Sequence, residues 1–83
     1  MSQLARTPKQ LGEILRRWRV LADLTQSQLA ARAGLRQATI SQIEGGSGAT
    51  KIETISSVLA ALDLELTIAP RSKSSSKDIE DIF

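Results

Sequence analysis

The stretch RQATISQIEGG, residues 36–46, carries side chains that suit hydrogen bonding to the edges of nucleic-acid bases. Gln37 has an amide that both donates and accepts, which fits the N7 and N6 groups of adenine. Ala38 offers a methyl group to thymine, and Arg36 can bind guanine or a phosphate. These residue types raise the question of which elements would present them to a ligand.

Two short helices joined by a tight turn would hold this stretch at the surface. The first is capped by Thr25 and stops at Gly34, a residue that adopts the left-handed conformation at little cost. The second is the stretch itself, whose apolar side is carried by Ile40 and Ile43, too little for a role in core packing alone. The spacing predicts a helix-turn-helix, whose second helix reaches the major groove with its N-terminal residues. A plain four-helix bundle with a polar connector remains the alternative.

Amphipathic helices are predicted on both sides of this pair. The first begins at the N-cap Thr7 and ends near Asp23. Its apolar residues, at spacings of three and four, are Leu11, Ile14, Leu15, Trp18, Leu21 and Ala22. Because Trp18 belongs to this stripe, it is interpreted as a core residue rather than a platform for base stacking. The last helix is predicted from the N-cap Thr50, with Glu53 completing a capping box.

The period of the apolar residues changes after the fourth helix. LELTIA, residues 64–69, alternates as a strand does. The residues expected to form it are Leu64, Leu66, Thr67 and Ile68. Nothing else in the sequence reads as a strand that could pair with it, so we expect the same strand of a second copy as its partner, in a homodimer.

The residues from Pro70 to the end are rich in serine and charge, which predicts a flexible tail. Its last residues, DIEDIF, place Ile79, Ile82 and Phe83 among acidic side chains. We interpret them as a segment that docks on another protein. A tail without a partner and a degradation signal are the two alternatives.

Composition narrows the possible functions. The chain has 83 residues, 41% of them hydrophobic and 2% aromatic, which suits one small aliphatic helix bundle. It has neither Cys nor His, so we expect no metal site and no cofactor, and an enzyme is a poor interpretation. No apolar run approaches the roughly 18 residues of a membrane span, and no signal peptide is recognisable. We therefore expect a cytoplasmic protein with no membrane partner.

The predicted helix pair is polar without being acidic. Between residues 26 and 48 the charged residues are Arg32, Arg36 and Glu44. Such a surface suits contact with phosphate, although an ordinary solvated face would have the same composition.

The run TQSQLAARAGLRQATISQIEGG resembles the helix-turn-helix of the lambda-repressor/Cro (XRE) family. The residues that carry the resemblance are Thr25, Gln26, Leu29, Ala30, Gly34, Ile40, Ser41 and Glu44. The match covers residues 7 to about 62. Two departures are Asp23, where the family often has Gly or Asn, and Gly45–Gly46 in place of Asn/Arg-Gly, which removes one possible phosphate ligand.

More narrowly, RQATIS, followed by the fourth helix and LELTI, is similar to the HipB-type antitoxins. These carry a helix-turn-helix, a C-terminal strand and a flexible tail, and they partner HipA-like serine/threonine kinase toxins. The resemblance implies an all-α, four-helix lambda-repressor-like domain with one C-terminal β-strand that pairs across a homodimer. We expect an N-terminal arm at residues 1–6, the domain at 7–69 and the flexible tail at 70–83.

The function that follows is a sequence-specific DNA-binding repressor, nucleoid-associated when bound to an inverted-repeat operator. As the antitoxin of a HipA-like kinase it would autoregulate its operon and neutralise the toxin, which would receive Ile79, Ile82 and Phe83. A stand-alone XRE-family regulator, phage or chromosomal, is the alternative. Two further interpretations are a protein-interaction module whose main role is to hold a toxin, and a small enzyme.

The site residues expected from this interpretation fall into three groups. Base contacts are expected from Ser27, Arg36, Gln37, Ala38, Ser41 and Gln42. Phosphate contacts are expected from Gln26, Thr50 and Lys51. The resemblance further implies that Arg19 and Glu44 form a structural ion pair between the first and third helices, so Glu44 is not a candidate catalytic acid.

Overall fold

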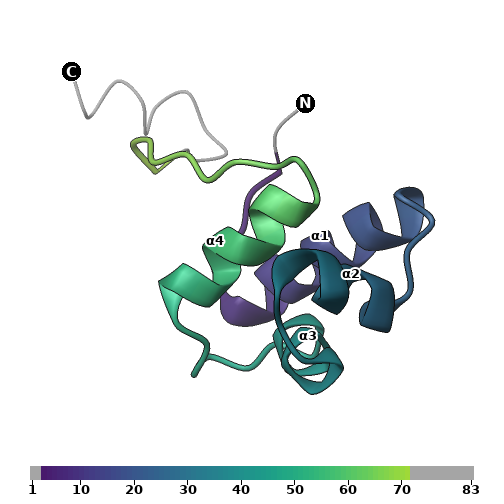
Figure 1. Cartoon of the computed structure of the whole chain (residues 1–83). Coiled ribbons are helices and arrows are strands. Elements are labelled where there is room, and N and C mark those ends of the chain that lie inside the picture. The colour runs from purple at the N-terminus through teal and green to yellow at the C-terminus, as the bar shows by residue number, and fades with distance from the viewer. Residues whose placement is uncertain (1–2, 72–83) are drawn as a thin grey trace.

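A computed structural model describes residues 3–71 as four helices, with no strand in that range. The helices are α1 (Pro8–Leu21), α2 (Gln26–Ala33), α3 (Gln37–Glu44) and α4 (Ile52–Ala61). α2 packs against α3 and α4, and α1 packs against α3 (Figure 1). The four predicted helices are confirmed. Within the described range, none has the length and apolarity that a membrane crossing needs.

The starts of α1 and α2 follow the capping residues. Thr25 accepts a hydrogen bond from the backbone N–H of Gln28, whose side chain accepts from the N–H of Thr25, which completes a capping box. At α1, Thr7 accepts from the N–H of Gln10 as predicted. The Gln10 side chain, however, accepts from the N–H of Arg6, at 2.7 Å, rather than from the N-cap itself.

The predicted cap of α4 is wrong by one residue. Lys51 is the N-cap, and its side chain makes no capping hydrogen bond. With the helix starting at Ile52, its third residue is Thr54, so Glu53 cannot close a box with Thr50. Glu53 instead lies in the first turn, where a carboxylate interacts favourably with the helix dipole.

All four helices end in the same backbone arrangement. Residues in the left-handed conformation follow each helix: Asp23, Gly34, Gly46 and Asp63, with φ of 59°, 69°, 89° and 58°. The next N–H then bonds the carbonyl five residues earlier, as from Leu24 to Arg19 at 3.2 Å and from Leu64 to Leu59 at 2.8 Å. Asp23, which departs from the family pattern, thus still closes α1.

The core is aliphatic and small. Its buried hydrophobic residues are Leu15, Leu24, Leu29, Ala30, Ile40, Ile43, Ile55, Val58 and Leu59. The interpretation of Trp18 as a core residue is wrong, because its side chain is 36% exposed and its indole N–H donates to Gln3 Oε1 at 2.9 Å. The apolar stripe of α1 is wider than the surface that the other helices cover, so the side chains at its edge stay half exposed.

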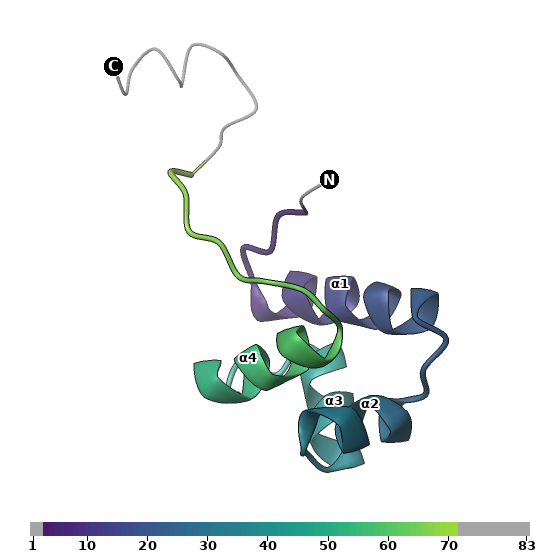
Figure 2. The ribbon, with the colours of Figure 1, turned by 45° about the horizontal axis from the view of Figure 1, so that its top comes forward.

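The segment after α4 does not form the predicted strand in this single chain. Residues 65–71 have no helix or strand assignment, and Leu66 and Ile68 are 55% and 96% exposed. A strand needs a second strand for its hydrogen bonds, and residues 3–71 contain none. In both ribbon views this segment and the N-terminal arm leave the molecule on the side opposite α3 (Figures 1 and 2). The proposed docking residues Ile79, Ile82 and Phe83 lie outside the described residues.

Candidate nucleic-acid interface

Gly12 allows α1 to approach the end of α3 closely. A Cβ atom at Gly12 would collide with the backbone oxygen of Ile43 and lie 2.9 Å from that of Glu44. Gly46 makes a similar approach, since its Cβ would lie 3.0 Å from the Cα of Lys9. Both contacts are backbone to backbone and fix the C-terminal end of α3 against α1. The polar N-terminal end of α3 is therefore held at a defined place.

The predicted ion pair joins α1 to the same end of α3. Arg19 donates from Nε to Glu44 Oε2 at 2.6 Å and from its NH2 group to Glu44 Oε1 at 3.0 Å. It also donates to the carbonyl of Leu24 at 2.7 Å. The two side chains are 12% and 5% exposed, and the hydrogen bonds from Arg19 to Glu44 raise the pKa of Arg19 further above its usual value. The pair is half-buried and bidentate, which makes it a rigid joint.

A chain of side-chain hydrogen bonds continues from this pair to the start of α3. Gln26 donates from Nε2 to Glu44 Oε1 at 3.1 Å. Gln37 donates from Nε2 to Gln26 Oε1 at 2.6 Å. Gln26 and Gln37 are the first residues of α2 and α3, so the beginnings of the two helices lie side by side.

The residues expected to contact bases lie exposed around this junction. They are Ser27 on α2 and Arg36, Gln37, Ala38, Ser41 and Gln42 on α3, with Arg36 as the N-cap. Ile40 and Ile43, which are 1% and 3% exposed, anchor the opposite face of α3 in the core. The short helix therefore packs mainly through two side chains and presents Gln37, Ala38, Ser41 and Gln42 outward.

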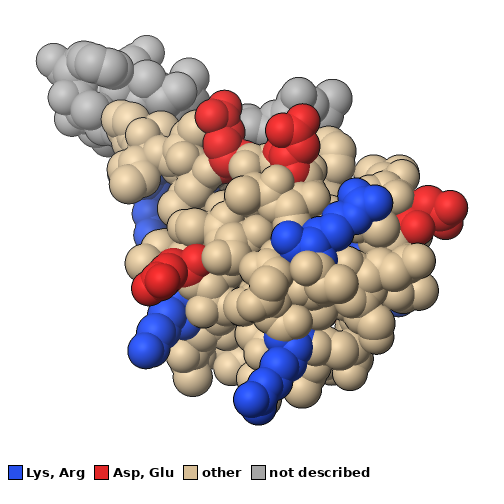
Figure 3. Space-filling model, viewed as in Figure 1, with Lys and Arg blue, Asp and Glu red and all other residues tan. Residues whose placement is uncertain are grey.

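The exposed charge of the helix pair is positive because its one carboxylate, Glu44, forms an ion pair with Arg19. Glu44 is 5% exposed and paired with Arg19, so the exposed charges between residues 26 and 48 are Arg32 and Arg36. On the face drawn in Figure 3, acidic side chains lie at the top and also at the lower left and the right edge, while the side chain that projects from the bottom is basic. A surface of this kind attracts phosphate.

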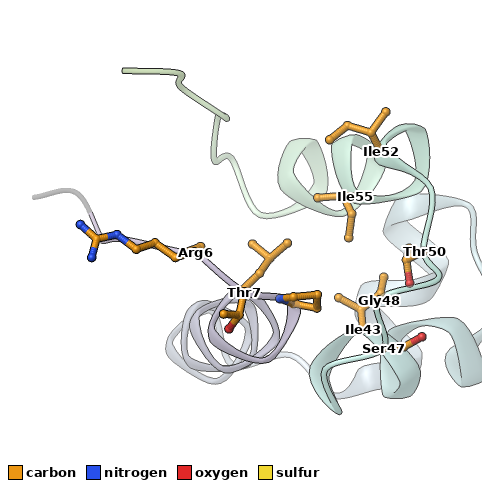
Figure 4. A pocket seen from close by; sticks show the side chains of 11 residues that line it. Arg6, Thr7, Ile43, Ser47, Gly48, Thr50, Ile52 and Ile55 are labelled. Carbon is orange, nitrogen blue, oxygen red and sulfur yellow. The ribbon is translucent and has the colours of Figure 1, made fainter. Parts of the chain in front are cut away.

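The residues expected to contact phosphate are only partly brought together. Lys51 is exposed at the start of α4, and Thr50 is half-buried at the rim of a groove between the beginnings of α1 and α4 (Figure 4). The groove is lined largely by apolar side chains, among them Leu11, Ile43 and Ile55. Gln26 lies apart from these two residues in sequence and is engaged with Glu44 and Gln37.

The bond between Gln26 and Gln37 is the feature of the candidate interface that sequence reasoning missed. The sequence placed these residues in separate groups, one for phosphate and one for bases. A signal was present, since a glutamine stands directly after each of the N-caps Thr25 and Arg36. Their contact depends on the crossing of two helices, which no local pattern gives.

Comparison with known proteins decides the family. A helix-turn-helix family profile matches residues 15–68 of this chain. The chain belongs to this helix-turn-helix family. As an XRE-family protein, it is a DNA-binding regulator from a class that is not enzymatic.

Individual relatives agree with this assignment. The Antitoxin HipB of Escherichia coli is 32% identical over 74 residues, which cover 89% of this chain and 84% of HipB. The HTH-type transcriptional regulator y4dL of Sinorhizobium fredii is 37% identical over 68 residues, which cover 82% of this chain but 35% of that relative. A chain of the solved HipA-HipB-O2-O3 complex is 32% identical with a TM-score of 0.79, over 86% of this chain and 100% of that one.

Proposed function

We propose that this protein is a transcriptional repressor that binds an inverted-repeat operator as a homodimer and serves as the antitoxin of a HipA-like kinase toxin. The observation that carries the DNA-reading part is the junction of α2 and α3. There the 2.6 Å bond between Gln26 and Gln37 joins the two helix starts beside the exposed residues of α3. In this fold family the second helix of the pair enters the major groove.

Base reading is assigned to the first turn of α3. Gln37 binds adenine, Ala38 contacts a thymine methyl group, and Arg36 binds guanine or a phosphate. Ser27 reaches the same groove from the start of α2, and Ser41 and Gln42 contribute from one turn further along α3. All six side chains belong to exposed residues.

Phosphate binding is assigned to the starts of α2 and α4. Lys51 is the N-cap of α4 and its side chain is not used for capping, so it is available to a phosphate. Thr50 precedes it and offers a hydroxyl group. Gln26 donates one amide hydrogen to Glu44 and retains the second, which can reach a phosphate.

The homodimer is assigned to residues 64–69. Leu66 and Ile68 are 55% and 96% exposed at alternate positions of this segment, and a two-stranded antiparallel ribbon would cover both. The segment leaves the molecule on the side opposite α3 (Figure 2), so a ribbon there leaves α3 free for DNA. Such a dimer would set two α3 helices about one turn of DNA apart, roughly 34–36 Å.

The toxin partnership is supported by the similarity to HipB over nearly the whole of both chains. The proposed domain organisation assigns residues 1–6 to an arm, 7–69 to DNA binding and dimerisation, and 70–83 to a tail. Ile79, Ile82 and Phe83 are proposed to enter an apolar pocket on the kinase, with the neighbouring acidic residues at its rim. The similarity to y4dL, which is described as an HTH-type transcriptional regulator, is compatible with the alternative of a stand-alone regulator.

The operator is tested with the DNA upstream of the protein's own gene. Footprinting should reveal protection of two inverted half-sites about one helical turn apart. Duplexes carrying one half-site should bind much more weakly in fluorescence anisotropy. A footprint on a single asymmetric site, bound equally well without a second half-site, would contradict the dimeric repressor.

The toxin role is tested by deleting residues 78–83. Operator affinity should stay unchanged, and affinity for the kinase encoded beside this gene should fall in calorimetry. Ser76→Ala is the control for an alteration of the tail that removes no large apolar side chain. Unchanged kinase affinity would remove the docking role, and a gene neighbourhood without such a kinase would favour the stand-alone regulator.

A further inference from the structure

The groove between the beginnings of α1 and α4 offers apolar surface to a ligand (Figure 4). Leu11, Ile43 and Ile55 line its inner part, and Ile52 at its edge is 68% exposed. Its volume is about 330 Å³, against roughly 300–1,000 Å³ for ligand sites in general. A space of this size suits a few apolar side chains of a peptide rather than a folded domain.

The charge around the groove is positive. Arg6 lines it, and none of the residues within 3–71 that line it is acidic. Two lysines, Lys9 and Lys51, are direct chain neighbours of lining residues. Their acidic counterparts are Glu53, which is exposed, and Glu44, which is already paired with Arg19. The groove therefore fits a segment that carries apolar side chains among carboxylates.

The chain itself contains such a segment in DIEDIF, residues 78–83, which lies outside the described residues. Ile79, Ile82 and Phe83 stand at spacings of three and four, so one turn of helix would set them on a single face. This spacing is typical of the anchors of a peptide that binds in an apolar groove. Three carboxylates separate or flank the anchors. We propose that residues 78–83 dock in the groove of their own chain.

The intervening chain is long enough for this contact. Leu64 is half-buried against the core, so the path starts at the end of α4, whereas the groove lies at its beginning. The helix has 10 residues and is about 15 Å long. Residues 65–77 can span roughly 45 Å when extended. A tether of this kind gives an effective concentration on the order of millimolar, so even a weak contact is populated.

Docking in the groove is compatible with DNA binding. Of the proposed DNA contacts only Thr50 lines the groove, and it is half-buried. The exposed side chains of α3 and Lys51 stay outside it. The apolar anchors are the same ones that are proposed to enter the kinase, so the groove would hold them until the kinase binds. The docking itself depends on neither DNA nor a toxin.

The test uses the absence of cysteine from the sequence, which makes Ser76→Cys a single attachment site for a nitroxide spin label. In the full chain, without DNA or kinase, the label should broaden the methyl NMR signals of Ile43 and Ile55. Reduction of the nitroxide should restore them. Methyl signals that the label leaves sharp would overturn the proposal.

Ile52→Asp is the variant that closes the groove to this segment. It removes an apolar side chain from the edge and adds a negative charge, at the first residue of α4, where an acidic residue is favourable. The broadening should disappear. Val20→Asp is the matched control, because Val20 is 56% exposed on α1 and does not line the groove, so it should keep the broadening. Broadening that persists in Ile52→Asp would overturn the groove as the site.

A peptide titration separates the contact from the tether. A synthetic peptide of residues 78–83, added to the chain that lacks them, should shift the Ile55 methyl signal and saturate at about millimolar concentration. The same peptide with Phe83→Ser should shift it far less. No shift with either peptide would overturn the docking. Because these samples contain no DNA or kinase, failure here leaves the proposed function standing.

The assignment to the same chain is tested with a mixed sample. Spin-labelled copies without isotopes are mixed with isotope-labelled copies that carry no spin label. Docking within one chain predicts that the Ile55 methyl signal stays sharp in this mixture. Broadening there as strong as in the doubly labelled chain would assign the segment to the groove of a second copy and overturn the proposal.

Discussion

The four-helix unit and the segment that follows it differ in how their backbone hydrogen bonds are satisfied. In the unit, every helix ends in a left-handed residue whose following N–H returns to the preceding turn. From residue 65 to 71 the backbone has no regular partner, and Ile68 is 96% exposed. One chain is therefore sufficient for the helices, whereas the extended segment has no partner within residues 3–71, and the proposed homodimer would supply one. Substitutions in the four-helix unit should therefore affect folding, whereas substitutions in the extended segment should affect dimer assembly.

The largest effect is expected inside the unit, at the ion pair. Glu44→Ala leaves the Arg19 guanidinium half-buried without its carboxylate and should lower the free energy of unfolding by about 3–5 kcal/mol. Glu53→Ala, which removes an exposed carboxylate from the first turn of α4, is the control and should cost well under about 1 kcal/mol. Urea denaturation followed by circular dichroism measures both. Equal midpoints for the two variants would show that the pair does not hold α1 to α3.

Gly12→Ala tests the close approach of α1 and α3. The added methyl group would collide with the backbone of α3, so we expect a loss of about 1–3 kcal/mol in the free energy of unfolding, despite the better helix propensity of alanine. Gly48→Ala is the matched control, because its methyl group would meet Pro8 Cγ at an ordinary 3.5 Å. A Gly12→Ala protein as stable as the control would mean that the helices can separate without cost.

The extended segment should respond differently. Leu66→Asn should weaken the proposed dimer at least about tenfold, because each copy loses apolar burial in the ribbon, while the thermal unfolding of the helices at low concentration changes little. Val20→Asn is the control, since Val20 has nearly the same exposure, 56% against 55%, on α1. Sedimentation velocity at micromolar concentrations gives the dissociation constants. A wild type that sediments as a monomer would defeat the ribbon altogether.

The smallest effect is expected at the rim of the interface. Lys51→Ala should weaken all DNA sequences alike and lower the slope of log affinity against log salt by about one, because one phosphate contact is lost. Arg17→Ala, on α1, is the control for the loss of an exposed positive charge. If Lys51→Ala changed the sequence preference and Gln37→Ala did not, the division into phosphate and base contacts would be wrong.

The contrast between the two regions also explains what the sequence could predict. Periodicity and capping residues located all four helices, because Thr7, Thr25 and Gly34 act within a few residues of the chain. The predicted N-cap of α4, Thr50, is one residue too early, because Thr50 and Lys51 are adjacent and either could precede the first turn. The exposure of Trp18 depends on how much of α1 the other helices cover, which is a property of the whole unit.

The candidate site was predictable as a group of residues but not as an arrangement. The residue types of the first turn of α3 indicated base reading, and the family resemblance supplied the contact between Arg19 and Glu44. The bond between Gln26 and Gln37 needed the crossing of α2 and α3, because the two residues are eleven positions apart and lie on different helices. Nothing in the alternation of residues 64–69 could distinguish a strand paired within one chain from one paired between chains.

The central claim is that the first turn of α3 reads DNA sequence, and one binding experiment tests it most directly. Fluorescence anisotropy compares the affinity of the wild type and of the Arg36→Ala, Gln37→Ala double variant for the footprinted operator and for a scrambled duplex of equal length. Loss of the base contacts should reduce the ratio of the two affinities by about tenfold or more, while binding to the scrambled duplex falls far less. A double variant that retains the wild-type ratio would contradict the claim.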